Sequence, residues 1–112
     1  MVPPATPAVL SWPAEVTTEA VVSLEREAGT ALGPADNTLV VDLTRTTFLS
    51  SSGLGLLVRT GKMLAERGGG LALAHPQPGV ARLLRAVGLD AVIPSFSSVE
   101  AARTHLRKPA AR

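Results

Sequence analysis

Apolar residues occur along the chain in two patterns, short continuous runs and longer stretches with helical spacing. The short runs have the length of β-strands, and they are Ala8–Trp12, Thr38–Leu43, Leu71–Ala74 and Ala91–Ile93. Pro13 ends the first run and Pro94 ends the last, because proline cannot donate to a strand ladder. Thr38–Leu43 is a compact apolar run, which predicts a strand buried on both faces of its sheet.

Four other segments repeat their apolar residues every three or four positions, which is the spacing of an amphipathic helix. The predicted helices are Val16–Leu32, Ser52–Arg67, Gly79–Val87 and Val99–Leu106. Thr17 or Thr18 is a candidate N-cap of the first helix, and Ser97 or Ser98 of the last. Strands that alternate with helices need crossover connections, so the chain is predicted to form one α/β domain with a largely parallel sheet.

The second predicted helix carries a stripe of apolar and small residues that is expected to face the core. This stripe consists of Leu54, Leu57, Val58, Gly61, Leu64 and Ala65, and that of the third helix of Val80, Leu83, Leu84 and Val87. Leu56 and Met63 fall roughly opposite the first stripe and are expected to be exposed. They indicate a partner-docking face rimmed by Arg59, Lys62 and Glu66, although scattered exposed apolar residues are also ordinary.

Composition narrows the function classes that this domain can serve. The chain has 112 residues, of which 46% are hydrophobic and 18% charged, so it can bury a core as a single domain. It has no cysteine, which excludes disulfides, thiolate metal sites and a cysteine nucleophile, and no cofactor or metal is expected. With a net charge of +2 and 3% aromatic residues, direct nucleic-acid binding is not expected. No apolar run approaches the ~20 residues of a membrane span and the N-terminus lacks signal-peptide features, which predicts a cytoplasmic protein without membrane insertion.

The segment TRTTFLSSSGLGLLV, residues 44–58, holds the candidate functional chemistry. It follows the apolar run that ends at Leu43, and in parallel sheets function gathers at the carboxyl ends of strands. A serine hydroxyl here can cap free backbone N–H groups, Gly53 allows a tight turn, and the helix dipole favours a phosphate. The simpler interpretation is that Ser50, Ser51 and Ser52 form only a cap and a turn. The Gly-x-Gly is neither a phosphate loop nor a nucleophile elbow, since the longer motifs are absent.

The stretch VVDLTRTTFLSSSGLGLLV, residues 40–58, resembles the signature of the STAS domain of anti-sigma factor antagonists. The usual signature is a strand ending in Asp-Leu, a short loop, an apolar residue, and then D-S-S-G-L-G or D-S-T-G-L-G. LSWPAEVTTEA, residues 10–20, is similar to the family's L-x-G-E-L-D-x-x-T. Residues 68–102 follow the family's strand, helix, Gly-Leu pair, short strand and final helix in order, so the resemblance covers about 90 residues.

The resemblance implies a STAS-like domain over residues 9–107, with a mixed, mostly parallel sheet of four to five strands and about four helices. Residues 1–8 are then a flexible N-terminal segment and residues 108–112 a basic C-terminal tail. It also implies a regulator without enzymatic activity, which binds a serine kinase (anti-sigma factor) of the GHKL ATPase type. The kinase otherwise holds a sigma factor or another output protein, and it separates from the antagonist after phosphorylating it. A serine phosphatase restores the cycle.

The family's phosphoacceptor corresponds to Ser51 in this chain, with Ser50 and Ser52 as competing acceptors. Ser50 stands where the family has an acidic residue, whereas Glu15 retains the acidic charge of the family's first loop. The residues expected to contact the kinase are Glu15, Ser50, Ser51, Ser52, Gly53, Leu54, Gly55, Leu56, Arg59 and Met63. Asp42 is expected to be structural, bonding the N–H groups of the loop that follows it.

Two other functions remain open from the sequence. A small stand-alone STAS protein can also be the cytoplasmic accessory subunit of an ABC lipid-transport system, and the altered motif permits this alternative. A small hydrolase that uses one of the serines is the third alternative, but no Ser, His and Asp set falls into place as a triad.

Overall fold

The computed structural model describes residues 6–107, so the expectations for residues 1–5 and for the tail 108–112 lie outside the described residues. Ala8, the last residue of the segment 1–8 expected to be flexible, instead begins a strand. Its elements are β1 (Ala8–Ser11), β2 (Glu15–Val16), α1 (Thr18–Ala31), β3 (Thr38–Asp42), β4 (Phe48–Leu49), α2 (Ser51–Glu66), β5 (Gly70–Ala74), α3 (Pro78–Ala86), the 3-10 helix η1 (Leu89–Ala91), β6 (Ser95–Phe96) and α4 (Val99–Arg107). The four predicted helices are confirmed. Among residues 6–107, no helix combines the length and apolarity that crossing a membrane requires.

The helix caps are among the predicted details that the structure confirms. Thr17 caps α1, where its hydroxyl accepts a hydrogen bond from the backbone N–H of Ala20 at 3.2 Å. Ser98 precedes α4, and its hydroxyl accepts from the N–H of Ala101 at 3.0 Å. Each bond satisfies a donor in the first helical turn that has no partner within the helix.

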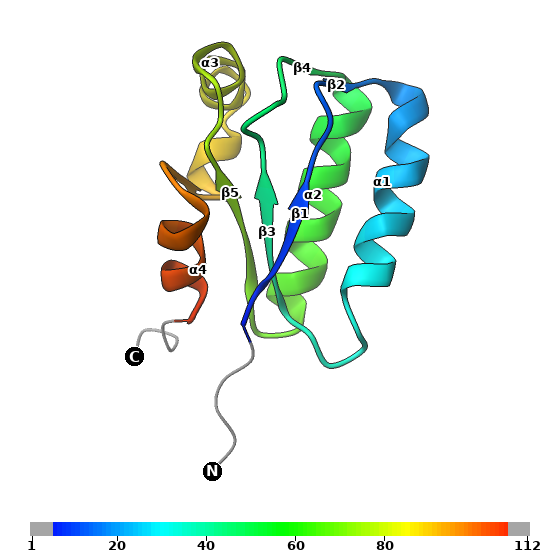
Figure 1. The fold of residues 1–112 in the computed structure, drawn as a ribbon, viewed down its shortest axis with the longest axis vertical. Helices are drawn as coiled ribbons and strands as arrows, with labels where there is room; N and C mark the ends of the chain where they lie inside the picture. Colours follow the sequence, from blue (N-terminus) through cyan, green and yellow to red (C-terminus); the bar gives the residue numbers. More distant parts are fainter. Residues whose placement is uncertain (1–5, 108–112) are drawn as a thin grey trace.

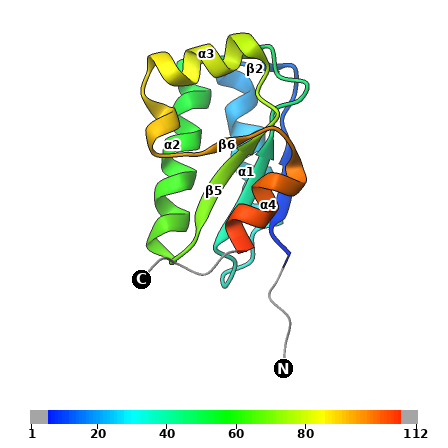
Figure 2. The same cartoon turned by 90° about the vertical axis from the view of Figure 1, so that its left-hand side faces the viewer.

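The strands form a four-stranded sheet in the order β1-β3-β5-β6 and a separate two-stranded pair, β2 with β4 (Figure 1, and Figure 2 for β6). Every pair among the described strands is parallel, with Ala8 opposite Leu39 in β3 and Leu39 opposite Leu71 in β5. The α/β fold predicted from the alternation of strands and helices is confirmed. Because all strands of the main sheet run in one direction, their carboxyl ends lie together at one end of the sheet.

The two faces of the main sheet carry cores of different size. Leu39 and Val41 of β3 point to one face, where they join the larger core made with α1, α2 and α3. Val40, between them, points to the other face and packs with Ala72 and Ala102. Helix α4 covers this face of the sheet (Figure 2). Strand side chains alternate between faces, so the small alanines of β5 lie beneath α4 and let that helix approach closely.

The predicted strand Ala91–Ile93 is wrong. Gly88, with a φ of 78°, ends α3 in the left-handed region, and the chain then turns through η1. The N–H of Ile93 donates to the carbonyl of Leu89 at 2.9 Å, and both side chains are buried. Apolar residues four apart thus share one side of a turn rather than forming a strand, and the sixth strand begins after Pro94.

The predicted inward stripe of α2 is wrong in its orientation. Leu57 and Leu64 are fully buried as expected, but Leu56 is only 3% exposed, whereas Val58 is 48% exposed. Met63, also expected outside, is half-buried against the larger core. The physical reason is that α2 packs against α1 as well as against β5, so it buries two adjoining sides. Ala65 in α2 and Val87 after α3, predicted to face inward, are exposed as well.

Candidate functional site

The serine-rich segment lies at the end of the molecule where β1 and β3 finish. There the N-termini of α1 and α2 lie beside the short β2–β4 pair (Figure 1). Two stretches of the chain, residues 15–18 and 48–51, therefore meet at the start of α2, as expected at the carboxyl end of a parallel sheet.

Hydrogen bonds from the loop 44–47 and from β4 fix the position at which α2 begins. The buried hydroxyl of Thr46 donates to the carbonyl of Pro13 at 2.9 Å. Two successive backbone amides of the loop, those of residues 47 and 48, donate to the carbonyl of Ala14 at 2.8 and 3.2 Å. The N–H of Ser50 then donates to the carbonyl of Val16 at 2.9 Å. These bonds replace the ladder that a longer strand pair would provide and hold the serines in one place.

The three consecutive serines have three different environments. Ser50 is the N-cap of α2, and its hydroxyl accepts from the N–H of Gly53 at 3.1 Å. The hydroxyl of Ser52 lies 3.3 Å from that of Thr18 in α1. Ser51 is exposed, and its hydroxyl has no hydrogen-bond partner within residues 6–107. The structure thus separates a capping serine, an interhelical serine and a free serine.

Gly53 is required by close packing rather than by an unusual backbone conformation. A Cβ atom added at Gly53 would lie 2.8 Å from Cγ1 of Val16 and 3.4 Å from Cδ2 of Leu49. The first turn of α2 therefore packs directly on the β2–β4 pair, at a distance that no side chain permits. A Cβ at Gly55 would meet only the guanidinium of Arg59, at 3.4 Å, which is the mobile end of a long side chain.

The surface around Ser51 combines charge and exposed apolar area. Glu15 and Phe48 are opposite each other in the β2–β4 pair, and both are exposed. Half of the Phe48 surface is accessible, at 50%. No acidic residue lies in the first turn of α2, so the positive end of its dipole is not compensated within that turn. The site therefore presents an accessible hydroxyl at a helix N-terminus, three residues after an exposed aromatic side chain.

The residues predicted to contact a kinase divide into three groups. Glu15, Ser51 and Arg59 are exposed, and Arg59 lies 3.7 Å from the carboxylate of Glu25 in α1. The half-buried residues are Ser50, Ser52, Leu54, Gly55 and Met63. Gly53 and Leu56 are buried, so the prediction that Leu56 forms an exposed docking face is wrong.

Sequence reasoning missed two residues of this surface, Phe48 and Thr18. The sequence predicts no strand at residues 48–49, so nothing in it indicates that Phe48 is exposed while Leu49 is buried, and aromatic residues are often buried. Its two-residue strand alternates, so that Leu49 is buried and Phe48 is not. That alternation is a usable signal, but only once the strand is known to have one solvent face.

Asp42 has the structural role that the sequence suggested. Its carboxylate accepts from the N–H of Thr44 at 3.0 Å and from the hydroxyl of Thr44 at 2.6 Å. This turn begins the loop that leads to the serines. The side-chain amide of Gln77 donates to the carbonyl of Thr44 at 2.8 Å and ties the same loop to the start of α3.

Comparison with known proteins gives matches in sequence and in structure. The model of the STAS domain family matches residues 3–102. The chain is 34% identical over 68 residues to an anti-sigma F factor antagonist from Paenibacillus polymyxa, a match that covers 61% of this chain and 58% of the relative's length.

Solved structures with the same architecture include two anti-sigma factor antagonists. A STAS domain protein of this class from Planctomyces limnophilus has a TM-score of 0.78 and 26% identity, covering 90% of each chain. The antagonist SpoIIAA in its unphosphorylated form has a TM-score of 0.69 and 23% identity, covering 87% of this chain and 86% of that one. Its phosphorylated form from Bacillus has a TM-score of 0.62 and 23% identity, covering 83% and 85%.

Proposed function

This chain belongs to the STAS domain family, and from that premise we propose that it is an anti-sigma factor antagonist controlled by phosphorylation of Ser51. In this proposal the unmodified protein binds a serine kinase of the GHKL type, which is also the anti-sigma factor. Phosphorylation by the kinase separates the two proteins, and a serine phosphatase reverses the modification. The protein acts in the cytoplasm as a regulator and catalyses no reaction itself.

The observation that carries the proposal is the difference between the three serines. Only the Ser51 hydroxyl is both exposed and free of a hydrogen-bond partner within the described residues. Modifying Ser50 would remove the acceptor that caps α2, and modifying Ser52 would disturb its contact with Thr18. Ser51 can take a phosphate without losing any hydrogen bond of the folded protein.

Electrostatics explains why a phosphate on Ser51 is compatible with the fold. The phosphate carries roughly −1.5 to −2 charges at pH 7, and it would lie in the uncompensated first turn of α2. A negative charge at a helix N-terminus is typically favourable by about 0.3–1 kcal/mol. We therefore expect the modified protein to keep its structure, while the local charge at the N-terminus of α2 changes from partly positive to negative.

The same charge accounts for release of the partner. A kinase that has docked against an exposed hydroxyl and a nearby aromatic ring meets a dianion after the reaction. Like-charge or unpaired charged contacts at an interface cost several kcal/mol, and each 1.4 kcal/mol weakens binding about tenfold. Release then needs no large change in shape. That SpoIIAA, of the same fold, has been solved in unphosphorylated and phosphorylated forms supports such a switch.

The replacement of the family's acidic residue by Ser50 leaves the helix cap in place. Serine and aspartate are both good N-caps, and Ser50 makes the capping bond to Gly53. What this chain lacks at position 50 is the negative charge. We propose that this absence slows phosphorylation without moving it to another serine.

The test is mass spectrometry of the protein after incubation with its GHKL kinase and ATP. We expect one phosphate, on Ser51, no phosphate on Ser51→Ala, and wild-type rates for Ser52→Ala. Ser50→Asp should be modified faster than the wild type, because it restores the family's charge. A wild-type rate for Ser51→Ala would assign the switch to another serine. A kinase that binds the protein but modifies no serine would show that the switch itself is absent.

A further inference from the structure

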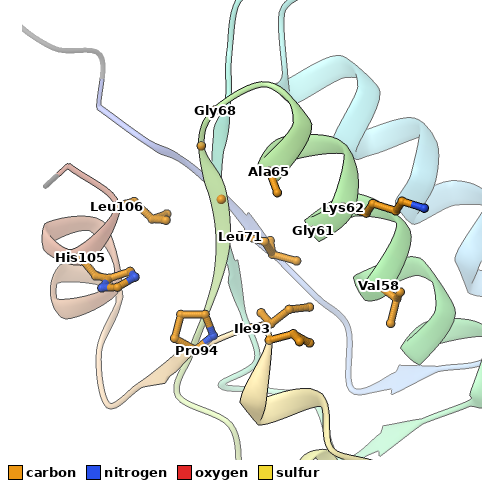
Figure 3. A pocket seen from close by; sticks show the side chains of 13 residues that line it. Val58, Gly61, Lys62, Ala65, Gly68, Leu71, Ile93, Pro94, His105 and Leu106 are labelled. Carbon is orange, nitrogen blue, oxygen red and sulfur yellow. The ribbon is translucent and has the colours of Figure 1, made fainter. Parts of the chain in front are cut away.

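A groove lies away from Ser51, on the side of α2 where the main sheet ends. Its walls are α2 and α4, and its base is formed by β5 and the segment after η1 (Figure 3). It encloses about 740 Å³. The lining side chains include Val58 and Ala65 of α2, Ile93 and Pro94 after η1, and Leu106 of α4.

The last strand, β6, covers only part of the β5 edge that lines this groove. It pairs with Leu73 and Ala74 and with no earlier residue of β5. The N–H of Leu73 donates to the carbonyl of Pro94 at 2.9 Å. The next bond of a parallel ladder would run from the N–H of residue 94 to the carbonyl of Leu71. Pro94 has no N–H, so the ladder ends there.

The backbone groups of Leu71 are therefore left without a strand partner on this side, within residues 6–107. The N–H of Gly70 donates to the carbonyl of Asn37 at 2.9 Å, toward β3. Successive residues of a strand direct their backbone groups to opposite sides, so Leu71 directs its N–H and its carbonyl toward the groove. Leu71 is only 4% exposed, which leaves these two polar groups poorly hydrated.

The rim of the groove is unusually apolar for this protein. Five large apolar side chains of the described surface are exposed, and two of them, Val58 at 48% and Val92 at 73%, line this groove. On the opposite wall, the ring of His105 packs on Phe96 with 5.0 Å between centroids. An apolar groove with unpaired backbone groups along its base is the arrangement by which proteins bind extended peptides as an added strand.

We propose that this groove binds an extended peptide segment of a partner protein, which continues the sheet at Leu71 where β6 leaves the edge open. Both faces of the added strand would be covered, one by α2 and the other by α4. The segment should therefore carry two or three consecutive β-branched apolar residues rather than alternate apolar and polar ones. This site is independent of the phosphorylation proposed at Ser51.

The test uses the synthetic peptide acetyl-Lys-Val-Ile-Val-Thr-amide and two N-methylated versions of it. One version is methylated on the backbone nitrogens of the odd-numbered peptide residues, and the other on those of the even-numbered residues. Binding is followed by NMR on ¹⁵N-labelled protein. We expect the Leu71 amide to shift and its hydrogen exchange to slow. One methylated version should bind about tenfold more weakly and the other like the parent, because only one set of nitrogens faces β5. Equal binding by all three peptides, or no binding by the parent, overturns the proposal.

Two tryptophan variants locate the site. Ala65→Trp fills the groove and should abolish peptide binding, whereas Glu66→Trp, at the next exposed position of α2, should not. Equal binding by the two variants would contradict the assignment. Displacement of the peptide by octanoate while the Leu71 amide stays unshifted would instead assign the groove to acyl chains. Both variants should be phosphorylated like the wild type, so this test fails or succeeds separately from that of Ser51.

Discussion

Ser50 and Ser51 are neighbours with opposite consequences for stability. The Ser50 hydroxyl accepts the capping bond from Gly53, whereas the Ser51 hydroxyl bonds to nothing within the described residues. We expect Ser50→Ala to lower the free energy of unfolding by about 1 kcal/mol, and Ser51→Ala to change it by less than about 0.5 kcal/mol. Urea denaturation measures both. A Ser51→Ala loss equal to that of Ser50→Ala would mean that Ser51 has a structural role.

Gly53 and Gly55 form a matched pair for testing the packing of the first turns of α2. A Cβ at residue 53 would meet Val16 at 2.8 Å, whereas one at residue 55 would meet only the end of Arg59. Gly53→Ala should destabilise the protein by about 1–3 kcal/mol through overpacking. Gly55→Ala should be neutral or stabilising, because alanine is the better helix former. Thermal unfolding distinguishes the two, and equal shifts would contradict the packing described for β2 and α2.

Phe48 replaces Leu56 as the apolar residue expected to contact the partner. Phe48, three residues before Ser51, is 50% exposed, and Leu56 is 3% exposed between α1 and α2. Phe48→Ser should leave unfolding nearly unchanged and weaken kinase binding about tenfold, as loss of an aromatic contact does. Leu56→Asp should instead unfold the protein. The account is contradicted if Phe48→Ser binds the kinase like the wild type while remaining folded.

At the scale of elements, helix α4 depends on small residues beneath it. Ala102 is fully buried and packs with Val40, Ala72 and Ala74. Ala102→Leu should therefore destabilise the protein by about 1–3 kcal/mol, because the sheet cannot move to admit a larger side chain. The control is Thr104→Leu, at an exposed position of the same helix. A small effect of Ala102→Leu in chemical denaturation would show that α4 can lift from the sheet at little cost.

The elements that the sequence predicted most directly are the central strands of the main sheet, which are buried on both faces. Thr38–Asp42 and Gly70–Ala74 lie within buried strands, and their apolar runs identify them directly. Helix α2 has two neighbours, so the contact with α1 buries Leu56 and rotates the buried side away from the stripe expected for the sheet alone. The short strand β6 follows Pro94 and pairs only two residues, which is too short a pattern to read in a sequence.

The candidate site was predicted in part for a similar reason. The serines and the helix that follows them are consecutive in sequence, so their placement at a helix N-terminus follows from local rules. The environments of the serines also depend on Thr18, whose hydroxyl lies next to that of Ser52, and on Val16, whose carbonyl accepts from the N–H of Ser50. Only the folded chain brings those residues to the start of α2.

At the scale of the whole molecule, the proposed switch changes charge rather than architecture. The formal net charge of the chain is +2, so one phosphate with roughly two negative charges brings it close to zero. The change is concentrated at the exposed side chain of Ser51, whereas Val16 of β2 and Leu49 of β4, which belong to the larger core at this end of the molecule, are buried. We therefore expect the circular dichroism spectrum and the unfolding midpoint to be nearly the same before and after phosphorylation.

The most direct test of the central proposal is the affinity of the GHKL kinase for this protein with and without a phosphate on Ser51, measured by isothermal titration calorimetry. The two forms are matched in sequence, and Ser51→Asp serves as an intermediate with a single added charge. We predict tight binding of the unmodified form, weaker binding of Ser51→Asp, and a loss of at least about a hundredfold on phosphorylation, since charged contacts at an interface are worth several kcal/mol. Equal affinity of the kinase for the phosphorylated and unphosphorylated forms would contradict the account.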